Sequence, residues 1–177
     1  IDSENRYEGA VPAGKKDYST LHLERDNAKC ILCRRCVAAC QQQHVAVIGA
    51  NNRGIDTSIG CAFNLQLSQV PCISCGQCVS VCPTGALGER LSLQKSVPLE
   101  TECTDTTCSF CSLGCSMHLE TGGGMLIKAV PDREGSVNKG LLCARGRFGF
   151  DCAELEERLN APLVKHGNVL EQTDYHE

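Results

Sequence analysis

The sequence has no tryptophan, and aromatic residues of any kind make up only 4% of its 177 residues. It has two methionines, and no apolar run is long enough to cross a bilayer. It also begins without a recognisable secretory signal, so we expect no membrane association. A chain this poor in large apolar side chains cannot build an ordinary hydrophobic core. We therefore expect another source of folding free energy.

Cysteine is what the sequence has in excess, with 15 residues. Eight of them form two runs with the spacing C-x2-C-x2-C-x3-C, and Pro83 directly follows the second run. This is the ligand spacing of bacterial ferredoxins with two [4Fe–4S] clusters. Ile and Val recur at matching places in both runs, which indicates an internal duplication. The first run is Cys30, Cys33, Cys36 and Cys40, and the second is Cys72, Cys75, Cys78 and Cys82.

The fourth cysteine of each run is expected on the helix that follows the ligand loop, where it points towards the other cluster. We therefore assign one cluster to Cys30, Cys33, Cys36 and Cys82, and the second to Cys72, Cys75, Cys78 and Cys40. Gly76 is expected where the backbone passes close to inorganic sulfide. Structural zinc is an alternative, but it would leave thiolates unused. Disulfides are another, although secreted frameworks rarely place cysteine at every third residue.

A third set follows with a different spacing: Cys108, Cys111, Cys115 and, after a long gap, Cys143. Between them, residues 116–120 and 125–130 flank three glycines, which predicts a hairpin with a glycine turn. A helix is expected after Cys143, through Leu159.

Residues 108–115, 138–148 and 158–163 together resemble the N-terminal iron–sulfur domain of molybdopterin oxidoreductases. With the double run upstream, residues 27–170 most resemble the front of cytoplasmic NAD-linked formate dehydrogenase catalytic subunits. The large subunit of respiratory complex I and electron-bifurcating hydrogenase subunits are related. The resemblance implies that Cys108, Cys111, Cys115 and Cys143 bind a third [4Fe–4S] cluster. Arg145 stands where the family has a lysine between cluster and pterin, so it is a candidate cofactor-binding residue.

The predicted fold class is α+β, with a 2×[4Fe–4S] ferredoxin-like unit followed by a small β-rich [4Fe–4S] domain of the molybdopterin oxidoreductase type. Short helices are expected near 36–43 and 78–82, and a strand, turn and strand over 45–48, 51–54 and 55–59. The expected boundaries are an extended arm over 1–26, the ferredoxin-like unit over 27–97, the third-cluster domain over 98–160, and a polar tail over 161–177.

Residues outside the three sets carry weaker signals. Cys61, Cys103 and Cys152 have no motif partners, so we expect small buried or half-buried thiols. Five cationic residues stand beside ligands and could compensate cluster charge, which would raise a reduction potential. We favour that role only for Arg145. The five are Arg34, Arg35, Lys139, Arg145 and Arg147.

The formal net charge is −4, and three oxidised clusters would bring it to about −10, which argues against nucleic acid as a partner. We predict an electron-transfer subunit with three [4Fe–4S] clusters and no active site of its own. Its expected partners are a flavin- and NAD-binding subunit and a catalytic subunit or ferredoxin. The setting is a cytoplasmic hetero-oligomeric complex of an anaerobe, of the formate dehydrogenase, hydrogenase or electron-bifurcating type. The alternatives are an N-terminal fragment of a molybdenum or tungsten formate dehydrogenase and a zinc-binding assembly module.

Overall fold

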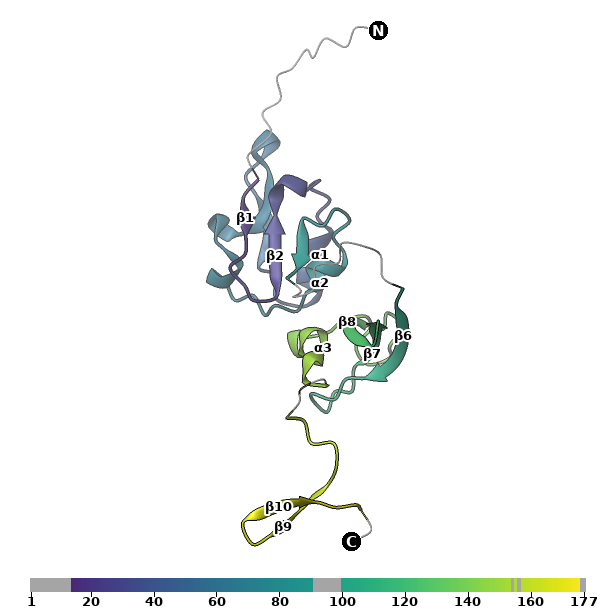
Figure 1. Cartoon of the computed structure of the whole chain (residues 1–177). Coiled ribbons are helices and arrows are strands. Elements are labelled where there is room, and N and C mark those ends of the chain that lie inside the picture. The colour runs from purple at the N-terminus through teal and green to yellow at the C-terminus, as the bar shows by residue number, and fades with distance from the viewer. Residues whose placement is uncertain (1–13, 91–99, 154, 156, 176–177) are drawn as a thin grey trace.

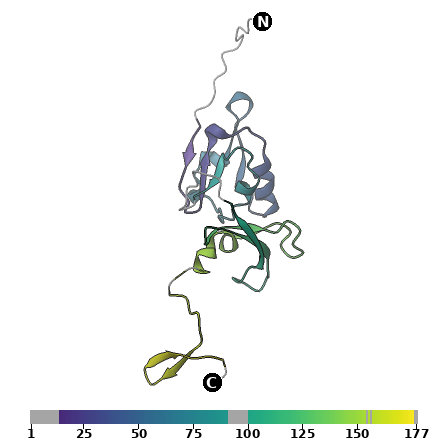
Figure 2. The same cartoon turned by 45° about the vertical axis from the view of Figure 1, so that its right-hand side comes forward.

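Two small units lie one above the other, and a two-stranded hairpin stands apart from both in either view of the computed structural model (Figures 1 and 2). The structure describes residues 14–90, 100–153, 155 and 157–175. The α+β class expected from the sequence is confirmed, because short helices and small antiparallel sheets occur in both units. No helix within the described ranges is long and apolar enough to cross a membrane.

The first unit has a three-stranded antiparallel sheet in the order β1-β2-β5 and a separate hairpin of β3 and β4. Its strands are β1 (Lys16–Asp17), β2 (Leu23–Asp26), β3 (Ile48–Asn51), β4 (Ser58–Cys61) and β5 (Leu87–Glu89). Its α-helices are α1 (Arg35–Gln42) and α2 (Gln77–Ser80). Short 3-10 turns lie at Asn27–Lys29, Gly54–Asp56, Ala62–Asn64 and Leu67–Gln69.

Residues 16–26 differ from the extended arm expected for them, because β1 and β2 are part of the first unit's sheet. Leu23 is 1% exposed and packs with Cys61 and Leu67. Asp17 is buried 3.5 Å from the guanidinium of Arg25, and it accepts hydrogen bonds from the N–H groups of Ser19 at 3.0 Å and Leu67 at 2.8 Å. The sequence did not predict these two strands, because strands of two and four residues are too short to show an alternating pattern of apolar and polar residues. Residues 1–13 lie outside the described part of the chain.

The helices expected near 36–43 and 78–82 are confirmed as α1 and α2. The hairpin between the two cysteine runs is present as well, but its strands begin about three residues later than expected. His44 and Ala46 adopt left-handed backbone angles, with φ of 57° and 52°, so residues 44–47 turn instead of forming a strand.

Cysteine side chains supply much of the packed interior of the first unit. One buried group contains three of them with two isoleucines and a leucine: Cys36, Cys40, Cys78, Ile48, Ile59 and Leu87. An interior of this kind has few large apolar groups, as the low aromatic content predicts.

The second unit is a three-stranded antiparallel sheet, β6 (Glu102–Thr107), β7 (Ser116–Gly122) and β8 (Met125–Pro131), beside the short helix α3 (Ala144–Phe148). The hairpin with a glycine turn is confirmed, because Gly123 and Gly124 join β7 to β8 with φ of 60° and 81°. The expectation of a helix through Leu159 was wrong. The helix ends at Phe148 and continues only as a 3-10 turn over Gly149–Ala153, in a stretch where two glycines lower the helix propensity.

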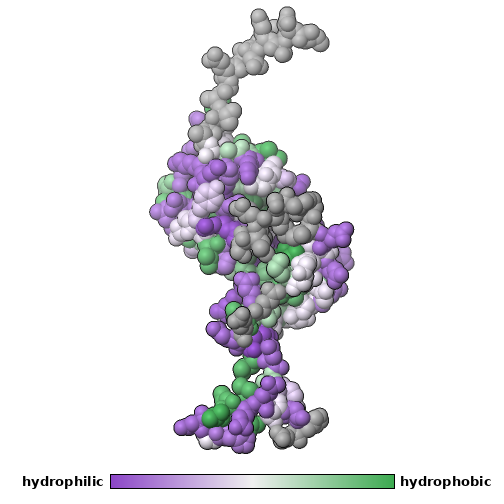
Figure 3. Space-filling view, in the orientation of Figure 1, coloured by the Kyte–Doolittle hydropathy of each residue, from purple (hydrophilic) through white to green (hydrophobic). Residues whose placement is uncertain are grey.

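The expected polar tail contains an antiparallel hairpin of β9 (Leu163–His166) and β10 (Val169–Gln172). Gly167, with φ of 64°, allows the tight turn between the strands. All eight strand residues are exposed, among them the apolar Val169 and Leu170. Figure 3 shows hydrophobic surface on this hairpin. The boundary expected between residues 97 and 98 lies in the segment 91–99, outside the described residues.

Candidate metal centres

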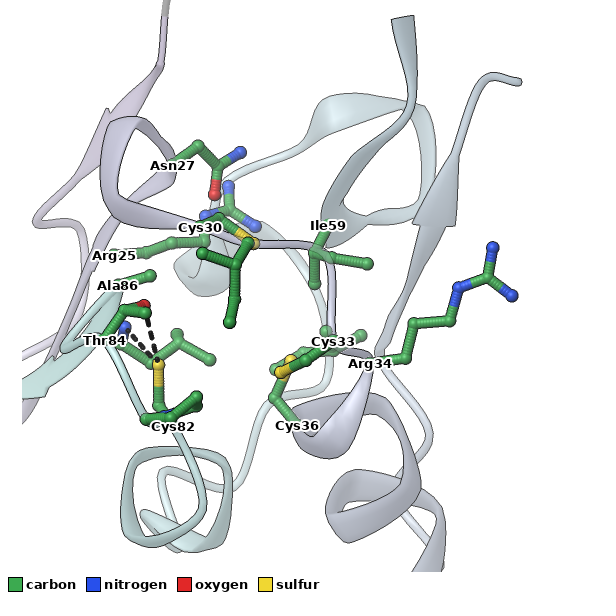
Figure 4. A pocket seen from close by; sticks show the side chains of 14 residues that line it. Arg25, Asn27, Cys30, Cys33, Arg34, Cys36, Ile59, Cys82, Thr84 and Ala86 are labelled. Carbon is green, nitrogen blue, oxygen red and sulfur yellow. Dashed lines mark hydrogen bonds between the residues drawn. The ribbon is translucent and has the colours of Figure 1, made fainter. Parts of the chain in front are cut away.

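A hollow lies between the start of α1 and the segment that leads into β5 (Figure 4). It is lined by the first three cysteines of the first run together with Cys82, the last cysteine of the second run. The folding therefore brings together the four thiols that the crossed assignment places at one site. Apolar side chains of Ile48, Ile59 and Leu87 complete the wall.

The two ligand loops have the same backbone conformation at matching positions. Leu32 and Ser74 have φ of 59° and 52°, and Arg34 and Gly76 have φ of 60° and 74°. A residue in this left-handed region beside ordinary residues turns successive N–H groups towards the inside of the loop, where they form a nest for an anion. In the first loop, the Leu32 N–H already donates to Cys30 Sγ at 3.4 Å. Both loops are therefore shaped to receive a negatively charged group.

The second set of thiols converges beside the first. Burial raises the pKa values of Cys75 and Cys78, and the negative charges of Cys72 and Cys40 raise both further. Cys36 of the first set also acts on Cys78, so the two sites adjoin. The pKa of Cys36 itself is raised to about 11 by burial and by Cys30.

Cys82 differs from these thiols, because its pKa is lowered. Burial alone would raise it, but the N–H groups of Leu87 and Thr84 and the Thr84 hydroxyl favour the thiolate. The Leu87 N–H donates to Cys82 Sγ at 3.5 Å, and the Thr84 hydroxyl lies 3.9 Å from the same sulfur (Figure 4). These groups hold a thiolate in place for a metal.

The third set lies in the second unit, where the loop after β6 meets the start of α3. Burial raises the pKa of Cys115, followed by the charges of Cys108, Cys111 and Cys143, so the four thiols are neighbours. Cys108 and Cys115 are buried, whereas Cys111 and Cys143 are exposed. This site therefore opens to the surface on one side.

Arg25 provides a test of whether the first hollow fits an anionic cluster. Its side chain is 6% exposed and lines the hollow, yet its Nε–H finds no acceptor within the described part of the chain. A buried donor without a partner costs free energy, so a missing acceptor is implied. The sulfur atoms of a [4Fe–4S] cluster are such acceptors, and the residues present fit this group.

Zinc is supported less well by the same side chains. Among the described residues, no three His, Cys, Asp or Glu side chains converge as a single metal ion requires. Zinc needs four ligand atoms within about 2.3 Å of one point. A four-iron cluster is bound through four different irons, so its thiolates stand farther apart.

The remaining candidates have different surroundings. Cys61 is fully buried and Cys152 partly buried, as expected, but Cys103 is exposed because it lies on the edge strand β6. Arg145, the cation that the motifs single out, is exposed, whereas Arg147, two residues further along α3, is 1% exposed. Their spacing of two places them on different sides of the helix, a signal that could have separated them.

Gly76 was expected to allow a close approach to sulfide. In the structure, a Cβ at this position would clash with Cδ and Nε of Arg147. Arg147 belongs to the second unit, so Gly76 makes room for a contact between the units.

Two family descriptions match separate parts of the chain. Residues 29–86 match the 4Fe-4S dicluster domain, and residues 101–154 match the molybdopterin oxidoreductase Fe4S4 domain. The chain therefore contains a 4Fe-4S dicluster domain followed by a molybdopterin oxidoreductase Fe4S4 domain. These two matches correspond to the two units of the structure.

The relatives are named as oxidoreductase subunits or as dehydrogenases. The chain is 35% identical to an NADH-quinone oxidoreductase subunit of Rhizobium meliloti over 150 residues, which cover 84% of this chain and 17% of that protein. It is 31% identical over 172 residues to the NADPH-Fe(3+) oxidoreductase subunit alpha of Geobacter sulfurreducens, with 92% and 19% covered. A putative formate dehydrogenase of Staphylococcus aureus is 27% identical over 222 residues, with 97% and 21% covered. The chain spans about a fifth of the length of these relatives. The identities do not favour formate dehydrogenase over NADH-quinone oxidoreductase, although the motifs resemble the former most.

Proposed function

We propose that this chain relays electrons through three [4Fe–4S] clusters inside a cytoplasmic oxidoreductase complex. When bound, such clusters accept and release single electrons. The observation that carries the proposal is the shared hollow of Cys82 with Cys30, Cys33 and Cys36, since only a crossed ferredoxin arrangement requires it.

The residues of the chain have three tasks in this function. The thiols hold the irons, the inward-facing N–H groups of the two loops stabilise the negative charge, and the apolar walls exclude water. The third set in the second unit extends the relay in the direction of the exposed Cys111 and Cys143.

We propose that the chain meets a flavin- and NAD-binding subunit at one side and a catalytic subunit or ferredoxin at the other. The names of the relatives support a complex with several subunits. A formate dehydrogenase, hydrogenase or electron-bifurcating setting in an anaerobe fits the same chemistry. The relative named as a formate dehydrogenase supports the second candidate, that this sequence is the N-terminal part of a molybdenum or tungsten catalytic subunit. The mass of the subunit purified from its native source distinguishes the two.

Iron and acid-labile sulfide per chain test the relay directly. Three clusters give about twelve of each. About eight of each would remove the third cluster from the proposal, and zinc in place of iron would overturn it.

A further inference from the structure

Arg147 is the largest fully buried side chain in the described part of the molecule, and it crosses from one unit to the other. It lies on α3 of the second unit, four residues after Cys143. Its guanidinium reaches the second ligand loop of the first unit, where Nε donates to the Cys75 carbonyl oxygen at 2.7 Å. An arginine buried between two units is costly unless its donors are satisfied, so this placement calls for a reason.

The partners of the Arg147 side chain among the described residues are all in the first unit. One terminal nitrogen donates to Gln77 Oε1, and the other lies 3.7 Å from the carboxylate of Glu89. Gln77 in turn donates to the Gly140 carbonyl oxygen at 2.8 Å, back in the second unit. The contact is therefore reciprocal, because a side chain of each unit donates to a carbonyl oxygen of the other.

One residue thus connects two candidate metal centres by hydrogen bonds. The side chain of Arg147 binds the carbonyl oxygen of Cys75, a thiol of the second site. Its backbone N–H donates to the carbonyl oxygen of Cys143, a thiol of the third site, at 3.1 Å. A further hydrogen bond between the units runs from Gln43 Nε2 to the Leu142 carbonyl oxygen at 3.4 Å. Gln43 lies three residues after Cys40, and Leu142 lies directly before Cys143.

We propose that Arg147 is the positioning residue between the second and third clusters. It fixes the distance between the two sites and places its positive charge beside the second one. This inference rests on the proposed relay and adds the point at which the electron passes between the units. The passage is a one-electron exchange in which one cluster is oxidised and the other reduced, and no bond or proton moves. The probability of electron tunnelling falls steeply with distance. A contact that fixes the distance between the second and third clusters therefore controls the rate of electron transfer between them.

The first test replaces Arg147 with glutamine in the complete chain with its clusters. We expect the midpoint potential of the second cluster to shift to a more negative value, since a positive charge that favours the reduced state is lost. We also expect a loss of the magnetic interaction between the second and third clusters in EPR spectra. The matched control is Arg145→Gln, which removes the same charge from the exposed side of the same helix and should leave the second cluster's potential unchanged.

A second pair of variants displaces Arg147 without removing it. Gly76→Ala introduces a Cβ against Cδ and Nε of Arg147, so it should weaken the same magnetic interaction. Gly85 also has a positive φ, 66°, but a Cβ there meets nothing within 4 Å. Gly85→Ala therefore imposes similar backbone strain and should retain the interaction.

Unchanged potential and unchanged magnetic interaction in Arg147→Gln, with the full iron content retained, would overturn the inference. If that variant loses iron, Arg147→Lys decides, because it keeps the charge but replaces the separate guanidinium nitrogens that bind Cys75 and Gln77 with a single ammonium nitrogen. We expect it to keep the potential and weaken the interaction. Loss of iron in both variants would make Arg147 a purely structural residue and end the proposal. The relay itself is judged separately, by the iron content and EPR spectra of the unaltered chain.

Discussion

Cys82 and Cys30 line the same hollow, although they belong to different cysteine runs in the sequence. We predict that Cys82→Ser alters the EPR spectrum of the first cluster in the same way as Cys33→Ser, because both remove a thiolate from one site. Cys40→Ser is the converse variant and should resemble Cys75→Ser. A Cys82→Ser spectrum that resembles Cys75→Ser instead would mean that each run binds its own cluster.

Leu23 tests whether residues 16–26 are part of the first unit. Its side chain is 1% exposed, so Leu23→Ala should lower the free energy of unfolding by about 2–5 kcal/mol. Urea titration followed by the visible absorbance of the clusters measures the change. Leu21 is 78% exposed, and Leu21→Ala should leave the midpoint almost unaltered. Equal behaviour of the two variants would indicate that this segment does not support the unit.

The cysteine spacing predicted more of this molecule than hydrophobic patterns did. A ligand run specifies the loop and the start of the next helix, because thiols spaced in this way have to surround one cluster. Helices α1 and α2 and the grouping of Cys82 with the first run followed from that constraint alone. The sequence also predicted the glycine turn before β8, since Gly123 and Gly124 supply the positive φ angles that a tight turn needs.

The features that the sequence did not predict are not constrained by ligand spacing or by a glycine turn. The strands β1 and β2 are held by long-range contacts, such as Asp17 with Leu67, which a local pattern does not contain. The role of Arg147 depends on the contact between the two units, and no residue spacing in the sequence predicts that contact. The family resemblance made Arg145 a candidate cofactor-binding residue, but a resemblance does not show which side of a short helix is buried.

Cys143 tests the third cluster. We predict that Cys143→Ser lowers the iron content from about twelve to about eight per chain, since one complete cluster loses a ligand at an exposed edge of its site. Cys103→Ser is the control, because Cys103 is also exposed but belongs to no ligand set. Iron and sulfide assays on both variants show whether Cys143 is a ligand of the third cluster. An iron content that is equally high in both would assign Cys143 no ligand role.

Arg145 lies directly after the third site and is exposed to solvent. We predict that Arg145→Gln lowers the midpoint potential of the Cys108–Cys143 cluster and leaves the other two unchanged. Because solvent screens its charge, the shift should be smaller than that of the second cluster in Arg147→Gln. Potentiometric EPR measures both shifts in one series, and an unmoved third midpoint would show that Arg145 has no influence on the cluster.

Arg25 has two roles in the structure that a double-mutant cycle can separate. Its guanidinium lies 3.5 Å from the buried carboxylate of Asp17. Arg25 also lines the first hollow, and its Nε–H has no acceptor among the described residues. Arg25→Met leaves the Asp17 charge buried and unpaired, which should cost about 3–5 kcal/mol of stability. Adding Asp17→Asn removes that charge and should recover part of the loss.

The potential of the first cluster should respond differently from stability across the same cycle. If the Arg25 Nε–H donates to cluster sulfur, Arg25→Met lowers the midpoint potential, since a positive donor that favours the more negative reduced state is lost. Asp17→Asn in the single variant leaves Arg25 charged, so the midpoint should stay or rise. The double variant should keep the lowered potential even where its stability recovers. A midpoint that follows stability instead, and recovers in the double variant, would show that Arg25 acts only through its pairing with Asp17.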